Sequence, residues 1–358
     1  MIVTSSDTQR IEMWDLLKLF AIFAVVLGHS MQHLLDGDAT ENPLFLWITT
    51  FHMPLFMAIS GFFSVKSFQR PVKHYLKNRS RQLLLPWVSW SIILAVTISV
   101  MDGMITWSGF KSLFIDSLWF LKSLFICGIL ALLGFKPKGN RIVWVVLSLM
   151  ISQVCMVWNV FIMYPCFLWG ILLAKKFSYI HKHLVKVSVI SGVIFFLSSI
   201  AISITPGFWI RNAGIRQLLL NGNLGYDLFI DVVLRRYIQL IIGIFGATFF
   251  IVLFYGLFST GKKHNFLASM GRFSLGVYVV QTLILETILP RFVHFMADDM
   301  LVFDLLVAPC ISVAITAVSL CISLIISGLG GVLATILLGE PIPSKHKMPV
   351  RSDLIDKS

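Results

Sequence analysis

The sequence predicts an all-α integral membrane protein with about ten transmembrane helices, and three observations support this prediction. Apolar residues make up 57% of the 358 residues, and charged residues only 13%. The mean hydropathy is +0.87, and one water-facing core cannot hide that much apolar surface. The apolar residues also fall into runs near the roughly 20 residues with which a helix crosses about 30 Å of hydrocarbon.

Ten apolar runs define the expected spans, which we place around a polar tunnel. In chain order they are Trp14–His33, Leu44–Val65, Leu83–Met101, Leu118–Phe135, Ile142–Trp158, Val160–Ala174, Val187–Ile204, Tyr237–Phe258, Phe273–Leu289 and Phe303–Leu329. Asn159 is the only clear break between the fifth and sixth runs, so a re-entrant or half-length segment is an open alternative there. We expect residues 1–340 to form the membrane domain and residues 341–358 a cytoplasmic tail.

The distribution of charge predicts the orientation of these spans. Lys and Arg number 29 against 17 Asp and Glu, which gives a net charge of +12. That excess alone would fit a nucleic-acid-binding protein, but most of the basic residues fall on one side of the expected spans, as the positive-inside bias predicts. We therefore expect both termini in the cytoplasm and no nucleic-acid partner.

The first span contains three ionisable residues, which are costly in hydrocarbon and usually face a partner or a cavity. Lys18 and His29 are eleven residues apart, about three helical turns, so they share one face of the helix about 16 Å apart along its axis. Asp15 lies one turn before Lys18. One interpretation is a tunnel with a charged mouth and a reactive imidazole near its outer end. The alternative is that Asp15 and Lys18 reach the interface while His29 is a packing residue.

The second span carries His52 near its outer end, level with His29. Pro54 within the span frees a backbone carbonyl, and Ser60-Gly61 allows another helix to approach closely. Proline and glycine are common in membrane helices, so these residues alone indicate no chemistry.

Six basic residues and no acidic residue lie between Lys66 and Arg81, just before the third span. One interpretation is an orientation signal that also attracts anionic headgroups. The other is a phosphate-binding cluster, in which Arg79 and Arg81 hold a nucleotide through charge-assisted hydrogen bonds.

Five motifs follow one another along nearly the whole chain. They are Trp14-Asp15-Leu16-Leu17-Lys18 leading to Gly28-His29-Ser30, His52-Met53-Pro54-Leu55-Phe56 with Ser60-Gly61-Phe62, Arg79 and Arg81 before Leu84-Leu85-Pro86, Leu118-Trp119-Phe120-Leu121, and Gly271-Arg272-Phe273-Ser274-Leu275-Gly276-Val277-Tyr278. This ordered set resembles the membrane-bound acyltransferase 3 family. The resemblance implies a multi-pass O-acyltransferase of the bacterial inner membrane, surrounded by membrane lipid.

The resemblance also implies roles on the donor side. Family members take an acyl group, usually from acetyl-CoA, that enters from the cytoplasm, and the reaction needs no metal. A basic residue and a histidine with ten residues between them mark the active helix, and Lys18 and His29 have this spacing. His29 would be the general base, Lys18 would serve the pantetheine or phosphate end of acyl-CoA, and Asp15 would orient Lys18. The residues expected to hold the nucleotide are Lys18, Lys77, Arg79 and Arg81.

The acceptor implied by the resemblance is a hydroxyl of a saccharide or lipid-linked sugar. The residues expected to line its site or the tunnel are His52, Ser60, Trp119, Tyr278, Gln281 and Glu286. Many relatives have a histidine where this chain has Gln281, which cannot titrate, so a proton-transfer role is in doubt there. Glu286 is expected to pair with an outer-loop arginine or to line the acceptor site. We expect Thr205–Arg236 to cap a cavity and Phe208–Asp231 to recognise the acceptor.

Two other classes of membrane protein stay open on sequence grounds. A transporter would also have many spans and a few buried charges, but the internal repeats or paired broken helices typical of transporters are not evident. A structural membrane protein would explain the spans, but not the aligned Asp15, Lys18 and His29. Thioester cleavage in the presence of an acceptor separates both from an acyltransferase.

Overall fold

The computed structural model describes residues 5–103, 106–135, 139–155, 158–205, 226–259, 265–296 and 300–341. Within these ranges the chain is helical, and the one β-type pairing is an isolated bridge between Leu35 and Phe295. The all-α fold class is therefore confirmed. Most of the expected cap Thr205–Arg236, and the tail beyond residue 341, lie outside the described residues.

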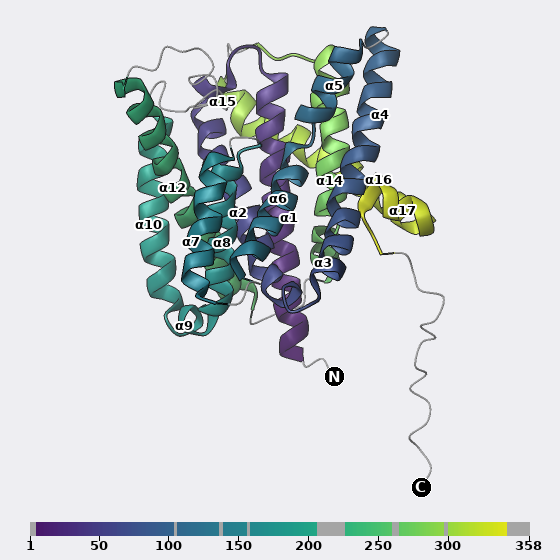
Figure 1. Ribbon diagram of the computed structural model, residues 1–358. Helices are drawn as coiled ribbons and strands as arrows, with labels where there is room; N and C mark the ends of the chain where they lie inside the picture. The colour runs from purple at the N-terminus through teal and green to yellow at the C-terminus, as the bar shows by residue number, and fades with distance from the viewer. Residues whose placement is uncertain are drawn as a thin grey trace.

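The helices run mostly side by side in one bundle (Figure 1). The elements that matter here are α1 Ser5–Leu34, α2 Pro43–Ser67, α3 Val72–Arg79, α4 Leu85–Asp102, α5 Trp107–Asp116, α6 Trp119–Phe135, α7 Arg141–Val154, α8 Val160–Lys175, α9 Phe177–Lys182, α10 Leu184–Ser203, α12 Tyr226–Phe258, α13 Asn265–Gly271, α14 Ser274–Gln281, α15 Met300–Val302, α16 Ala308–Leu329 and α17 Gly331–Leu338. Three π-helical segments, Ser80–Leu84, Thr282–Ile288 and Phe303–Val307, join neighbouring helices.

Six helices in the described ranges are long and apolar enough to cross a membrane. They are Glu12–Leu34, Pro43–Ser67, Val72–Asp102, Leu184–Ser203, Val233–Phe258 and Met300–Leu329. The pair α5 and α6, bent by 55°, adds a seventh if it counts as one broken span. Two further apolar helices, Arg141–Gln153 and Val160–Lys175, are shorter. The chain is thus a multi-pass membrane protein, and a count of ten spans stays a prediction.

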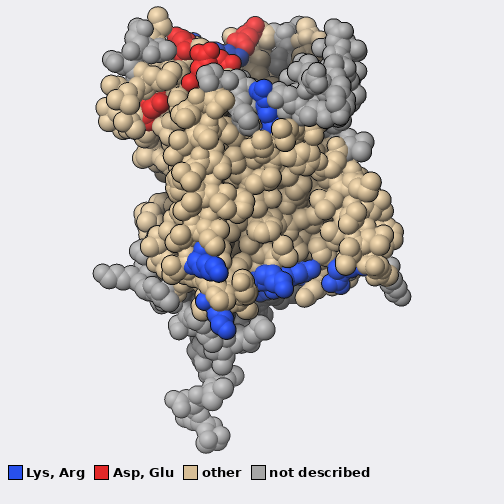
Figure 2. All heavy atoms as spheres, turned by 90° about the vertical axis from the view of Figure 1, so that its left-hand side faces the viewer, with Lys and Arg blue, Asp and Glu red and all other residues tan. Residues whose placement is uncertain are grey.

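The surface of the bundle is what a bilayer requires. Large apolar side chains face outward, among them Val100 at 79% exposure and Leu197 at 67%. On the face drawn in Figure 2, a broad belt without charge separates an end that shows only Lys and Arg from an end that shows Asp and Glu together with a few Lys or Arg side chains. α1 begins at the basic end (Figure 1). This polarity agrees with the predicted orientation, in which the basic end faces the cytoplasm.

α1 and α2 form the centre of the bundle, and α8 lies against α2. A Cβ atom on Gly61 would collide with the backbone carbonyl of Phe167, and one on Gly170 with that of Ala58. Only glycine permits two helix backbones to come so close. The prediction that Ser60-Gly61 admits a close neighbour is confirmed, and the close contact fixes α2 against α8.

Among the helices that the hydropathy pattern did not predict are α5 and α17. α5 is only ten residues long and mixes polar with apolar residues, so it reads as a loop. Its carboxyl end is held by the buried Lys122, whose Nζ donates to the carbonyls of Phe114, Ile115 and Ser117. A cation at the unsatisfied carbonyls of a helix end is stabilising, so Lys122 has a structural role here.

Candidate active site

An inner cavity of about 360 Å³ lies beside the part of α1 that holds Lys18. Its wall combines residues of α1, α2, the Ser80–Leu84 segment, α6, α14 and α17. Lys18, Arg79 and Glu340 are its charged residues, and Ser60 and Tyr278 supply hydroxyl groups. The remaining wall is largely apolar. A narrow apolar chamber with two cations suits a long ligand that carries an anionic end.

Asp15 pairs with Lys18 and also joins α1 to the α13–α14 connection. The Lys18 Nζ donates to Asp15 Oδ1 at 2.9 Å, and the Arg272 Nε donates to Oδ2 at 3.3 Å. The Asp15 side chain is 6% exposed, against 28% for Lys18. Gly271 makes the junction possible, because a Cβ there would collide with the carbonyl of Asp15. The ammonium group of Lys18 is thereby fixed at the wall of the inner cavity.

The structure separates the four basic residues expected to hold the nucleotide, because Lys18 and Arg79 line the inner cavity and the other two do not. Arg79 lines the inner cavity, and its Nη2 donates to Ser64 Oγ at 2.9 Å. Arg81 and Lys77 are not among the residues that line either cavity described here. Lys77 is exposed, and the buried Nε of Arg81 has no hydrogen-bond partner. Residues two apart in a helix do not share a face, so Arg79 and Arg81 point differently.

An outer cavity of about 340 Å³ lies at the His29 end of α1. Its lining includes His29 and His33 of α1 and His52 of α2. Glu286 comes from the Thr282–Ile288 segment, and Trp119 is the first residue of α6. The prediction that His52 lies level with His29 is confirmed, because both line this one cavity. The His52 Nδ1 lies 2.8 Å from the carbonyl oxygen of Ile48, which fixes its ring.

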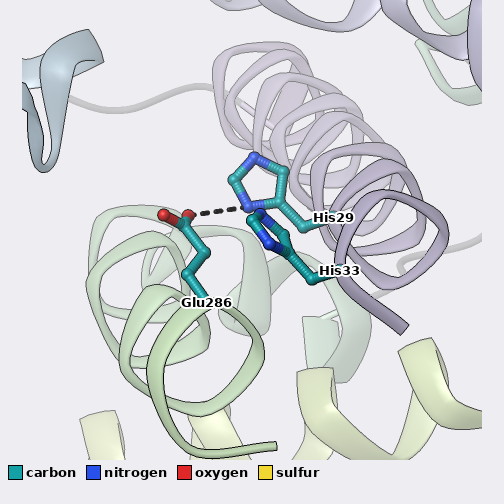
Figure 3. A group of neighbouring side chains, drawn as sticks. All are labelled: His29, His33 and Glu286. Carbon is teal, nitrogen blue, oxygen red and sulfur yellow. Dashed lines mark ion pairs between the residues drawn. The ribbon is translucent and has the colours of Figure 1, made fainter. Parts of the chain in front are cut away.

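His29 and Glu286 come within ion-pair distance of each other across two helices. Nδ1 of His29 lies 2.9 Å from Oε1 of Glu286, although the two atoms are not aligned as a hydrogen bond. Figure 3 shows both imidazoles of α1 directed toward this carboxylate, with the ring centroids of His29 and His33 5.8 Å apart. Thr282 also donates to Glu286 Oε1, at 3.1 Å. Arg291, one of the outer-loop arginines that could have been the partner of Glu286, instead pairs with Asp102.

The inner and outer cavities share two lining residues, Met53 and Tyr278. Met53 lies on α2 one residue after His52, and Tyr278 lies on α14. The ring of Tyr278 packs edge-on against Phe120, with 5.9 Å between centroids. The two cavities therefore meet at one wall, with Lys18 and Arg79 on one side of it and His29 and Glu286 on the other.

The family assignment rests on a match to nearly the whole chain. Residues 11–328 match the model of the acyltransferase 3 family, described as an acyltransferase domain. The chain belongs to the acyltransferase 3 family. The resemblance drawn from the five sequence motifs is thus confirmed.

Curated relatives match shorter stretches of this acyltransferase 3 protein. Nodulation protein NolL of Mesorhizobium japonicum is 32% identical over 147 residues, which are 37% of this chain and 38% of that protein. Nodulation protein NolL of Sinorhizobium fredii is 37% identical over 86 residues, 23% of each chain. The matched stretches thus span well under half the length of these relatives. No solved structure matches the chain.

The remaining expected lining residues fall in different places. Ser60 lines the inner cavity, Trp119 the outer one, and Tyr278 both. Gln281 is fully buried and lines neither cavity. Its Nε2 donates to the carbonyl of Tyr278 and to Thr282 Oγ1, while its Oε1 has no partner. In this structure Gln281 supports the helix that carries Glu286, and the expected acceptor segment Phe208–Asp231 falls almost wholly outside the described residues.

The backbone turns sharply where α6 enters the outer cavity. Leu118 has φ +49°, in the left-handed region that leucine seldom occupies. Such strain costs about 1–3 kcal/mol and persists only where the surroundings fix it, often at functional sites. Leu118 is 3% exposed and lines the outer cavity beside Trp119. The strained turn sets the direction in which Trp119 enters the cavity.

The residues of the outer cavity that sequence reasoning missed include His33, Arg236 and Gln239. His33 lies four residues after His29, a helical spacing that places both on one face. Arg236 was assigned to a loop because the expected span began one residue later, whereas α12 begins at Tyr226. The spacing of the two histidines could therefore have predicted that His33 lies beside His29, whereas the sequence contained no comparable pattern that would have placed Arg236 in the cavity.

Among the described residues, the outer cavity also contains the one group of side chains suited to hold a metal ion. His29, His33 and Glu286 each offer one ligand atom, and these atoms lie within 4.8 Å of one another. Two histidines and one glutamate are a common ligand set for zinc. The expectation of a metal-free reaction stays a prediction.

Proposed function

We propose that this acyltransferase 3 protein transfers an acyl group, acetyl above all, from acyl-CoA to a sugar hydroxyl of a cell-surface polysaccharide or glycolipid. One observation carries the proposal: two cavities meet at Met53 and Tyr278, with cations in one and a histidine–carboxylate pair in the other. A donor with a negatively charged end and a thioester at the opposite end of a long arm fits this arrangement.

Acyl-CoA would occupy the inner cavity from the cytoplasmic side. Lys18 and Arg79 would bind the phosphates, and Asp15 holds the ammonium group of Lys18 in position. The apolar wall between Ile22 and Tyr278 would surround the pantetheine arm. The rise of about 16 Å between Lys18 and His29 is comparable to the reach of that arm, so the thioester would arrive beside the shared wall.

The acceptor hydroxyl would react in the outer cavity. Its oxygen attacks the thioester carbonyl carbon while His29 takes the hydroxyl proton, the carbon–sulfur bond breaks, and the thiolate of CoA leaves and takes up a proton. With Nδ1 beside Glu286, Nε2 is the nitrogen assigned to accept the proton. The carboxylate then stabilises the imidazolium, as an orienting acid does in other general-base pairs.

The location that accompanies this proposal is the bacterial inner membrane, with both termini in the cytoplasm. The polarity of the surface in Figure 2 supports the orientation, because the basic end carries the start of α1. In that orientation the inner cavity opens toward the cytoplasmic pool of acyl-CoA, and His29 lies toward the outer face.

The test compares His29→Ala with His294→Ala in the purified full-length protein. His294 also pairs with a carboxylate, Asp36 at 3.3 Å, but it is half exposed and lines neither cavity. Acetyl-CoA and a panel of methyl glycosides are supplied, free thiol is followed colorimetrically, and O-acetyl sugar by mass spectrometry. We expect His29→Ala to lose about 10²- to 10⁴-fold in rate, and His294→Ala to stay near wild type. Full activity of His29→Ala would defeat the mechanism, and no thiol release by wild type would favour a transporter or a structural protein.

A further inference from the structure

The outer cavity contains a buried arginine that the proposed reaction does not use. Arg236 lies on α12, lines this cavity together with His29 and Glu286, and is 8% exposed. Its described neighbour is the ring of Phe161, 5.7 Å from the guanidinium carbon, and no Asp or Glu of the described residues lies within ion-pair distance of it. A guanidinium withdrawn from water without a counter-ion is costly, and such groups mark ligand sites in membrane proteins.

Gln239 gives a second, independent sign of a ligand. It lies three residues after Arg236 on the same face of α12, lines the same cavity and is 6% exposed. Its buried Nε2 has no hydrogen-bond partner. An unsatisfied buried donor is rare in a folded protein, and here it lies beside an unpaired cation. Both groups are donors that an acceptor oxygen would satisfy, and the positive charge of Arg236 favours an anionic one.

The other charged groups around this cavity do not neutralise Arg236. Glu286 pairs with His29. Asp116 also lines the cavity, but it is exposed and accepts a hydrogen bond from Ser112 at 3.1 Å. The positive charge on α12 therefore faces the chamber in which the acceptor would sit.

We infer that Arg236 and Gln239 bind an anionic group of the acceptor, so that the sugar acylated here carries a carboxylate or a phosphate close to the reacting hydroxyl. The planar guanidinium matches both groups through paired hydrogen bonds, and Gln239 adds a third donor. A volume of about 340 Å³ lies at the small end of ligand pockets, which suits one charged sugar unit. This inference rests on the proposed function, because it assigns the outer cavity to the acceptor.

The experiment measures binding rather than turnover, using the purified full-length protein in detergent. The probes are methyl β-D-glucuronide, glucose 1-phosphate and the neutral methyl β-D-glucoside, and the readout is the dissociation constant from equilibrium dialysis. We expect a charged probe to bind about tenfold to a hundredfold more tightly than the neutral one, as a charge-assisted hydrogen bond would provide. Preference for the glucuronide indicates a uronic acid, and preference for the phosphate indicates a phosphorylated sugar.

Three variants make this test specific. Arg236→Gln should remove the preference for the charged probe, and Arg236→Lys should keep part of it. Arg235→Gln, one residue earlier and outside the lining of both cavities, should leave it unchanged. Equal binding of charged and neutral probes, no binding of any probe, or an unaltered preference in Arg236→Gln would each overturn the inference. None of these results depends on the release of CoA that requires His29. The anionic acceptor and the proposed acyl transfer can therefore be refuted separately.

Discussion

The ion pair between His29 and Glu286 gives the proposed general base a quantitative test. Glu286→Gln keeps the size of the side chain and removes its charge. At 2.9 Å, the carboxylate contacts the ring that must become positive when it takes the proton. Once His29 is protonated, its Nδ1–H should align with Oε1, and a hydrogen bond to a charged group contributes about 1.5–3 kcal/mol. The two side chains are 20% and 31% exposed, which places this pair at the lower end, about 1.5–2 kcal/mol.

That loss corresponds to a fall in kcat of about 10- to 30-fold. The KM for acetyl-CoA should stay unchanged, because Glu286 lines the outer cavity and not the inner one. Initial rates of thiol release at varied acetyl-CoA measure both constants, and Asp36→Asn, which breaks the exposed pair with His294, is the matched control. The double variant His29→Ala/Glu286→Gln should be no slower than His29→Ala, since residues that act as a unit are not additive. An unchanged kcat, or a further loss in the double variant, would refute the pairing.

Three further outcomes follow from the two cavities. Arg79→Gln should raise the KM for acetyl-CoA about tenfold with little change in kcat, since it removes one phosphate contact. Lys77→Gln, at a residue outside the lining of both cavities, should leave this KM unaltered, and equal effects of the two variants would argue against an arginine site in the inner cavity. Met53→Trp should fill the passage between the two cavities and lower kcat at least about tenfold by keeping the thioester from His29. Calorimetry should detect unchanged binding of adenosine 3′,5′-bisphosphate, and normal turnover would show that the pantetheine arm takes another route. Added Zn²⁺ should inhibit reversibly by binding the proton-accepting His29 together with His33 and Glu286. His33→Ala should shift the inhibition curve to higher zinc concentration, and equal zinc sensitivity of variant and wild type would exclude this three-residue site.

The sequence predicted relations within one helix better than relations between helices. Asp15, Lys18 and His29 share a face because the helical period fixes their directions, and the structure places Lys18 and His29 in adjoining cavities. Glu286 was recognised as a costly charge, but its partner lies 257 residues earlier on α1. No local pattern reports which helices become neighbours.

Element boundaries limited the rest of the prediction. Arg79 and Arg81 were expected to act together, although residues two apart in a helix do not share a face, and hydropathy contains no signal for the π-helical turn Ser80–Leu84. Arg236 was read as part of a loop because charged residues end an apolar run, whereas α12 continues through it from Tyr226. The short α5 was missed for a different reason, since it is held by Lys122 from another helix rather than by its own apolar face.

A structure of the protein with a non-hydrolysable acetyl-CoA analogue tests the central claim most directly. The account predicts that the nucleotide phosphates lie beside Lys18 and Arg79 in the inner cavity. The pantetheine arm would then pass between Met53 and Tyr278, with the acyl carbon within reach of His29. An analogue bound wholly on one side of that wall, or an arm directed away from His29 into lipid, would contradict it.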